Sequence, residues 1–234
     1  MNGLATQGIA PPREQSTYFT KVFAWMAVAL AVTGAVAGAI GSNGTALHAL
    51  FTGRGLWIIF ALFFVELALV AGLVGLVQHM GLFEAAATFL AYAALNGVTL
   101  SVIFAIYTTK SIFSTFLVTA GMFGGIALWG YFTKADLTGW GHFLFMALWG
   151  QLLGLIVNLF WLNNTLYWLT TATGVLLFSA LTAYDVQKLK NYEPPSGSDT
   201  VVVEKDAIVG ALALYLDFVN LFLYLLRIFG RAKR

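Results

Sequence analysis

The chain has 234 residues, of which 60% are hydrophobic and only 9% are charged, whereas soluble domains carry about 25% charged residues. Folding in water would expose more apolar surface than soluble proteins tolerate, so the composition indicates a protein of the lipid bilayer. The net charge of +2 is too small to indicate a nucleic-acid partner. The absence of cysteine excludes disulfides and thiolate chemistry, and three scattered histidines without an H-E-x-x-H motif argue against a zinc enzyme.

Seven apolar segments of about 20 residues follow one another, separated by short polar or glycine-rich breaks. Because backbone groups in lipid must be hydrogen-bonded within the protein, these segments are predicted to be helices. The expected fold class is therefore all-α: a polytopic integral membrane protein with a bundle of seven transmembrane helices. The segments are 19–40, 56–78, 83–106, 111–132, 141–161, 165–187 and 206–228.

The flanking residues leave no room for a second domain. Residues 1–18 are expected to form a cytoplasmic N-terminal tail, residues 19–228 the transmembrane domain and residues 229–234 a basic C-terminal tail. A cleaved signal peptide is the alternative for the N-terminus, but the apolar run from Val22 to Ile40 is longer than a usual signal core. The polar stretch 188–205 is expected to be a solvated loop.

The distribution of basic residues leaves two arrangements open. If all seven segments span, six Lys and Arg residues fall on each side of the membrane and give no bias. If the last segment were re-entrant, ten would lie on the N-terminal side against two. We expect a cytoplasmic N-terminus in both arrangements.

Three glycine pairs spaced four residues apart are expected to serve close helix packing. They are Gly34 and Gly38, Gly121 and Gly125, and Gly150 and Gly154.

Carboxylates inside apolar segments are informative, because each costs about 2.5–3.5 kcal/mol near the bilayer centre on insertion scales. Glu66, Asp185 and Asp217 lie inside such segments. Glu84 lies at the start of the third segment, where it is expected to cap that helix.

Asp217 lies in the middle of the last segment, on a stripe of small and polar residues at helical spacing. Because the other faces of that helix are apolar, the stripe must face protein or water, and the seventh helix is predicted to be central. The stripe consists of Asp206, Gly210, Ala213, Asp217, Asn220 and Tyr224.

Asp185 and Glu66 each allow a structural interpretation. Asp185 lies near the end of the sixth segment, where it could simply pair with Lys188 at the interface. Glu66 lies midway along the second segment and could be a neutral, hydrogen-bonded acid. Alternatively, Glu66 lines or supports a pore, together with Asn220, Gly210 and Ala213.

The sixth and seventh segments run antiparallel, so Asp185 and Asp217 could approach each other. Two carboxylates at one low-dielectric site cannot easily both ionise, so the pair would bind and release a proton as a unit. With one proton it would hold two helices together, and fully ionised it would repel them and attract a cation. Because calcium prefers six to eight oxygens, these groups would bind it only weakly, which suits passage.

Three stretches of the sequence resemble the Bax inhibitor-1 family (transmembrane Bax inhibitor motif proteins), in its bacterial branch. They are Leu181–Lys190 (LTAYDVQKLK), Ala211–Arg227 (ALALYLDFVNLFLYLLR) and Gly130–Leu137 (GYFTKADL). The resemblance implies seven spanning helices with the last one central. It also implies a pH-sensitive calcium leak controlled by two aspartates, here Asp185 and Asp217, in a bacterial inner membrane.

One position departs from the family pattern. Some members place an Arg at the end of the second helix, whereas the matching stretch here reads Leu76-Val-Gln-His-Met80. If His79 takes the role of that Arg as a partner of the aspartates, the pH response gains a group that titrates near neutrality. The alternative is a loop histidine at the membrane interface.

The leading functional hypothesis is a proton-gated, calcium-permeable leak channel with membrane lipid and calcium as its partners, no cofactor and no enzymatic activity. A second hypothesis is a regulator without flux that binds a membrane-anchored quality-control protease. A third is an intramembrane aspartyl protease, in which two carboxyls share a proton. The Gly-x-Gly-Asp that such proteases need is replaced here by Leu214-Tyr-Leu-Asp217. A retinal protein is excluded because the seventh segment has no interior lysine.

Overall fold

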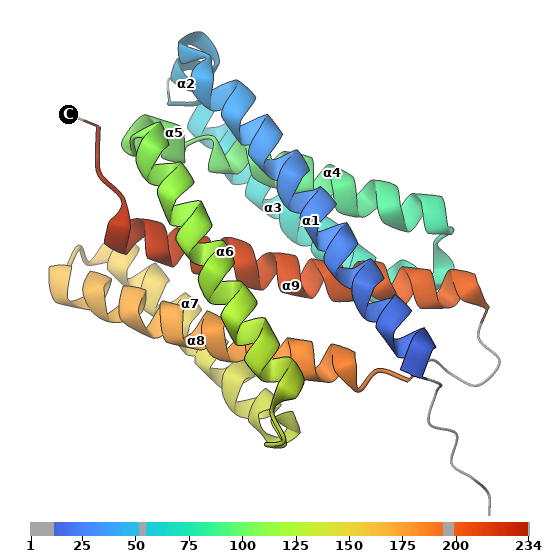
Figure 1. Ribbon diagram of the computed structural model, residues 1–234. Helices are drawn as coiled ribbons and strands as arrows, with labels where there is room; N and C mark the ends of the chain where they lie inside the picture. The colour runs from blue at the N-terminus through green and yellow to red at the C-terminus, as the bar shows by residue number, and fades with distance from the viewer. Residues whose placement is uncertain (1–11, 52–54, 194–198, 234) are drawn as a thin grey trace, which may run out of the picture.

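The computed structural model describes residues 12–51, 55–193 and 199–233, and these residues are almost entirely helical (Figure 1). Seven of the described helical stretches are long and apolar enough to cross a membrane, as the sequence predicted. The helices are α1 (Pro12–Ser42), α2 (Gly44–Phe51), α3 (Gly55–Leu76), α4 (Leu82–Leu100), α5 (Ile103–Ile106), α6 (Thr109–Phe132), α7 (Gly141–Phe160), α8 (Asn164–Lys190) and α9 (Thr200–Phe229), with short 3₁₀ helices η1 (Val77–His79) and η2 (Thr138–Trp140).

Several helix ends follow from local side chains. The Oε2 atom of Glu84 accepts a hydrogen bond from the backbone N–H of Gly81 at 2.9 Å, which confirms its predicted role as the cap of α4. Asn163 caps α8 by accepting from the backbone of Thr165. Pro12 stands at the first position of α1, where a missing N–H costs nothing. The helix thus includes residues 12–18 of the expected tail, and residues 1–11 lie outside the described part.

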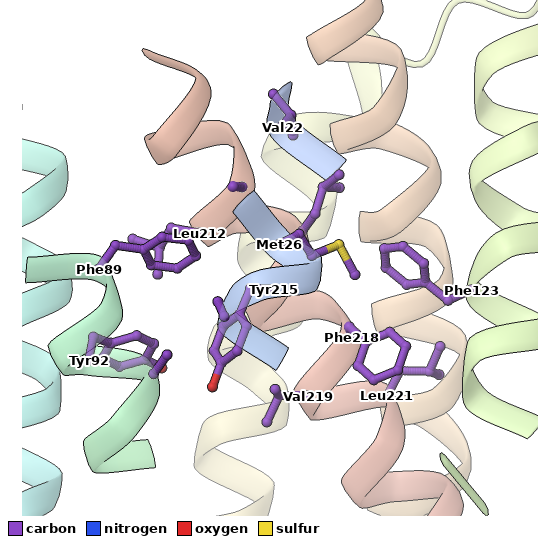
Figure 2. Packing of buried hydrophobic residues seen from close by; sticks show 14 of the residues in the cluster. Val22, Met26, Phe89, Tyr92, Phe123, Leu212, Tyr215, Phe218, Val219 and Leu221 are labelled. Atoms are coloured by element: carbon purple, nitrogen blue, oxygen red, sulfur yellow. The ribbon is translucent and has the colours of Figure 1, made fainter. Parts of the chain in front are cut away.

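The last helix, α9, is the centre of the bundle, as expected from its polar stripe. In its most apolar window 72% of the residues are buried, against 11–39% in the other six spans. The helices α1, α3 and α4 lie on one side of α9, and α6, α7 and α8 lie on the other (Figure 1). Close packing around α9 is shown in Figure 2, where Tyr215 lies beside Tyr92 and Phe89 of α4 while Phe218 faces Phe123 of α6.

The glycine pairs singled out in the sequence are mostly not the sites of close helix contact. A Cβ atom added at Gly34, Gly38, Gly121, Gly125 or Gly150 would meet nothing within 4 Å, so those expectations are wrong, and only Gly154 contacts a neighbouring helix, at Thr170. Other glycines permit the close approaches. A Cβ at Gly97 of α4 would lie 2.8 Å from the Thr33 carbonyl of α1, and one at Gly130 of α6 would lie 2.7 Å from the Ala183 carbonyl of α8.

The C-terminal end of α9 lies at the opposite end of the bundle from its start. The start of α9 is tied to the start of α1 by an ion pair between Glu204 and Lys21 at 2.7 Å. The chain after α9 pairs instead with the connection between α5 and α6, where the Thr108 N–H donates to the Arg231 carbonyl at 3.0 Å. A helix that runs from one end of the bundle to the other is a spanning helix, so the structure favours seven crossings over a re-entrant last segment.

Candidate functional site

The structure brings Asp185 of α8 and Asp217 of α9 together in the centre of the bundle. Their carboxyl groups are joined by a side-chain hydrogen bond. Asp217 is buried, with 4% of its surface exposed, and Asp185 is half-buried. The two residues come from helices that pack against each other, so the pair bridges the central helix and one of its two flanking groups.

A hydrogen bond between two carboxyl groups requires a proton, because two carboxylates without one would repel each other. In a low-dielectric site that repulsion is strong. The second oxygen of Asp217, Oδ2, has no hydrogen-bond partner among the described residues. The site thus has one buried carboxyl oxygen that no described protein group hydrogen-bonds.

The charged neighbour that acts on the pair is Lys188, one turn further along α8 and exposed. Lys188 and Asp185 form no ion pair within 4 Å in the described part of the chain, so Lys188 acts on Asp185 through its charge at longer range and not as a direct partner. His79 lies in η1 with an exposed side chain, and it is not among the groups that act on either aspartate.

Glu66 belongs to a separate polar cluster on the other side of α9. Its carboxyl is buried, and it accepts hydrogen bonds from Thr99 Oγ1 at 2.6 Å and from Asn96 Nδ2 at 3.5 Å, both on α4. These two hydrogen bonds agree with the structural interpretation of Glu66 as a hydrogen-bonded acid. The structure does not bring Glu66 to the aspartate pair.

The other residues of the predicted stripe support the packing of α9. Gly210 is buried, and a Cβ there would lie 2.6 Å from a methyl carbon of Leu189 on α8. Ala213 and Asn220 are half-buried, and the amide of Asn220 donates to the Leu216 carbonyl of its own helix at 2.8 Å. The Asn220 donor is thus already occupied by the backbone.

A buried lysine that the sequence did not single out lies at the end of the second span. Lys205 of α9 is 6% exposed, and its Nζ donates to the carbonyls of Gln78 at 3.1 Å and Met80 at 3.2 Å. These carbonyls lie at the C-terminal end of α3 and η1, where a positive charge is favourable. The cation that holds this end of the second span is therefore Lys205 and not His79.

The start of α9 is tied to three other segments through Asp206. Its carboxylate accepts hydrogen bonds from Gln78 Nε2 at 2.9 Å and from the Tyr192 hydroxyl, and its carbonyl accepts from Tyr18 of α1. Burial and the neighbouring Asp206 raise the pKa of Tyr192, so its hydroxyl stays a donor over the ordinary pH range. These bonds close one end of the bundle.

The family-like stretch 130–137 covers the end of α6 and the start of its connection to α7, and Gln187 of α8 holds that connection in place. The Gln187 Oε1 atom accepts from the Leu137 N–H, and its Nε2 donates to the Ala135 carbonyl, both at 2.7 Å. In the same connection, hydrogen bonds from Thr138 hold the pKa of Asp136 below its ordinary value. Gln187 follows Asp185 by two residues, so two of the family-like stretches meet in space.

These features define the class: an all-α integral membrane protein with seven spans, whose central helix carries half of a buried carboxyl pair. The family model described as "Inhibitor of apoptosis-promoting Bax1" matches residues 15–234, so the chain belongs to the Bax inhibitor-1 family. The resemblance seen in the sequence is thereby confirmed.

Similar chains come from several bacteria. The "Inner membrane protein YbhL" of Escherichia coli is 47% identical over 227 residues, which cover 96% of each chain. A protein of Borreliella burgdorferi is 39% identical over 219 residues and 94% of each chain. One from Rickettsia prowazekii is 39% identical over 217 residues, which cover 92% of this chain and 90% of the relative.

Proposed function

We propose that this protein is a pH-sensitive, calcium-permeable leak channel of a bacterial inner membrane, with its N-terminus in the cytoplasm and the Asp185–Asp217 pair as its gate. The observation that carries the proposal is the hydrogen bond between these two carboxyls at the centre of the bundle. The inner-membrane location is supported by the name of the relative YbhL.

The charge of the Asp185–Asp217 pair determines whether α8 and α9 stay joined. While the pair holds a proton, the hydrogen bond joins α8 to α9 and keeps the channel closed. When the pH rises and the proton leaves, two negative charges at contact distance repel each other, and the helices part. The flux is therefore expected to rise with pH.

Calcium is the permeant ion that the site suits, and it is a substrate of the channel and not a resident metal. No group of three His, Asp or Glu side chains that could hold a metal occurs among the described residues. Two ionised carboxylates attract a divalent cation, but they supply fewer oxygens than the six to eight that tight calcium binding requires. Weak binding lets the ion leave again, as conduction demands.

The proposal is tested by calcium flux into dye-loaded liposomes that contain the purified protein, measured across a pH series. We expect a flux that rises with pH in the unmodified protein. In Asp217→Asn the amide donates permanently to Asp185 and carries no charge, so the flux should stay low and lose its pH dependence. Asp206→Asn, which removes a carboxylate from the same helix outside the pair, is the matched control and should keep the pH dependence.

A flux in Asp217→Asn that follows the same pH curve as the unmodified protein would refute the gate. A complete absence of flux at every pH would refute the channel and favour the non-transporting regulator of a membrane-anchored protease. The aspartyl-protease alternative would require cleavage of a helical reporter substrate that disappears in Asp217→Ala.

A further inference from the structure

The two ends of the bundle differ in their acidic residues and not in their basic ones. With seven spans, six Lys and Arg residues fall at each end. Seven of the ten acidic residues fall at the end where α9 begins, three lie inside spans, and none falls at the end where α9 finishes. Stretches without any Asp or Glu are 15–65, 85–135, 137–184 and 218–234. The end of the bundle where α9 finishes, which we call the basic end, therefore has positive charge that no acid offsets. Its described Lys and Arg residues are Lys110, Arg227, Arg231 and Lys233.

Backbone hydrogen bonds hold the C-terminal chain at this end, beside α5 and the start of α6 (Figure 1). The Arg231 carbonyl accepts from the Thr108 N–H at 3.0 Å, and the Lys233 N–H donates to the Ile106 carbonyl at 2.9 Å. The first turn of α6 follows at once and carries Lys110. The fold thus gathers basic residues from two distant parts of the sequence.

The side chains of Lys110, Arg231 and Lys233 are exposed. In the described part of the chain no carboxylate lies within 4 Å of them, and the side chains of Lys110 and Arg231 have no described hydrogen-bond partner. The Lys233 Nζ atom donates one hydrogen bond, to the Phe104 carbonyl at 2.6 Å, and an ammonium has three hydrogens to donate. These groups can therefore bind an anion from outside the protein.

Arg227 lies half-buried in the last turn of α9. Its guanidinium lies 5.6 Å from the ring centre of Tyr167 on α8 and 5.1 Å from that of Tyr224. Such ring contacts restrict the plane of the guanidinium and leave its N–H groups free to donate. A guanidinium held in this way suits a phosphate, which it can bind through two parallel hydrogen bonds.

Exposed apolar side chains lie next to these charges. Ile228 and Phe229 follow Arg227 at the end of α9, and Phe113 lies three residues after Lys110 on α6, on the same helix face. A phospholipid has the same arrangement, with a phosphate directly next to its apolar chains. A small water-soluble anion would use only the charges.

We propose that the basic end binds an anionic phospholipid: Lys110, Arg231 and Lys233 attract the headgroup and Arg227 binds its phosphate, while the neighbouring apolar side chains contact its acyl chains. This site lies outside the carboxyl pair and does not depend on the proposed channel. It also holds in either orientation of the protein, because it requires only that this end lies at a membrane surface.

Native mass spectrometry of the full chain in detergent tests the site by titration with dioleoyl phosphatidylglycerol. Dioleoyl phosphatidylcholine, which has the same acyl chains and no net charge, is the reference lipid and should bind more weakly. Arg231→Gln combined with Lys233→Gln should weaken phosphatidylglycerol binding about 30-fold, at about fivefold for each basic side chain near a membrane surface. Arg227→Gln alone should weaken it about fivefold. Phosphatidylcholine binding should stay unchanged in both variants.

Lys134→Gln combined with Lys188→Gln is the matched control, because it removes two exposed basic side chains from the opposite end of the bundle. It should leave phosphatidylglycerol binding unchanged. Arg231→Lys combined with Lys233→Arg keeps both charges and should keep the lipid preference, which separates a lost charge from a disturbed fold.

Soluble competitors distinguish a lipid from other anions. At constant ionic strength, neither inorganic phosphate nor a hexaglutamate peptide should displace phosphatidylglycerol. Displacement by phosphate would assign the site to a free anion, displacement by the peptide would assign it to an acidic protein segment, and either result would overturn the inference. Equal binding of the two lipids, or equal weakening by the control and by the Arg231 and Lys233 variant, would overturn it as well.

Discussion

At the scale of single residues, the stability of a membrane-embedded carboxyl depends on its partner. Asp217 is buried among apolar side chains, and its described partner is Asp185. Asp185→Ala removes that partner and leaves a second unsatisfied polar atom, whereas Asp185→Asn keeps a hydrogen-bonding group. We expect the alanine variant to lose about 1–3 kcal/mol more stability than the asparagine variant.

The measurement is the thermal unfolding midpoint of the two variants in the same detergent. Leu176→Ala serves as a control, since it removes an exposed side chain from the same helix that does not act on the pair. Equal midpoints for the alanine and asparagine variants would show that the hydrogen bond between the aspartates does not contribute to stability.

The residues at membrane depth that carry charge could be found from the sequence, because a carboxylate is conspicuous among apolar residues. Asp185, Asp217 and Glu66 were all identified in this way. Tyr215, Gln187 and Lys205 were not, because a tyrosine or glutamine inside an apolar helix carries no comparable signal. Lys205 was expected in the loop 188–205, and that expectation is wrong at both ends, since α8 continues to Lys190 and α9 begins at Thr200. Their partners lie far away in sequence, so only the fold shows what they bind.

At the scale of secondary-structure elements, the connection between α6 and α7 depends on one side chain. Gln187 is buried and makes two hydrogen bonds of 2.7 Å to the backbone of this connection. Gln187→Leu keeps the volume and leaves the Leu137 N–H and the Ala135 carbonyl without that partner. We expect faster amide hydrogen exchange at residues 135–137 and a loss of about 1–3 kcal/mol of stability.

The exchange experiment should show no change in α1 and α4, which lie on the other side of α9. Gln151→Leu is a useful comparison, because Gln151 is equally buried but bonds to Thr170 and Tyr224 instead. Protection at residues 135–137 that is unaltered by Gln187→Leu would contradict the structural role given to this glutamine.

The elements themselves followed from the sequence, since all seven apolar segments are helices close to their expected bounds. The glycine pairs show that residue spacing alone does not identify the sites of close helix contact. Gly121 and Gly125 share one face of α6, but the spacing does not say whether that face meets a helix or lipid. Gly97 and Gly130, which do allow close contacts, form no recognisable pair.

At the scale of the whole molecule, an odd number of spans places the two termini on opposite sides of the membrane. The pairing of the C-terminal chain with Tyr107 and Thr108 supports this arrangement. The basic residues alone could not decide it, because with seven spans their number is equal on the two sides. With a cytoplasmic N-terminus, a C-terminal reporter that is active only outside the cytoplasm should be active, and one active only in the cytoplasm should be inactive.

The same two reporters fused after residue 193, in the connection between α8 and α9, are the internal control and should give the opposite result. Cytoplasmic activity of both the C-terminal and the internal fusion would contradict seven spans. External activity of the internal fusion together with cytoplasmic activity of the C-terminal fusion would reverse the proposed orientation.

We propose that Asp185 and Asp217 share a proton that is lost as the pH rises. Infrared difference spectroscopy tests it most directly, because a protonated carboxyl has a carbonyl band that an ionised one lacks. We expect a band that disappears with rising pH, survives in Glu66→Gln and is altered in both Asp185→Asn and Asp217→Asn. A spectrum without a pH-dependent carboxyl band, or with one that both asparagine variants leave unchanged, would contradict the account.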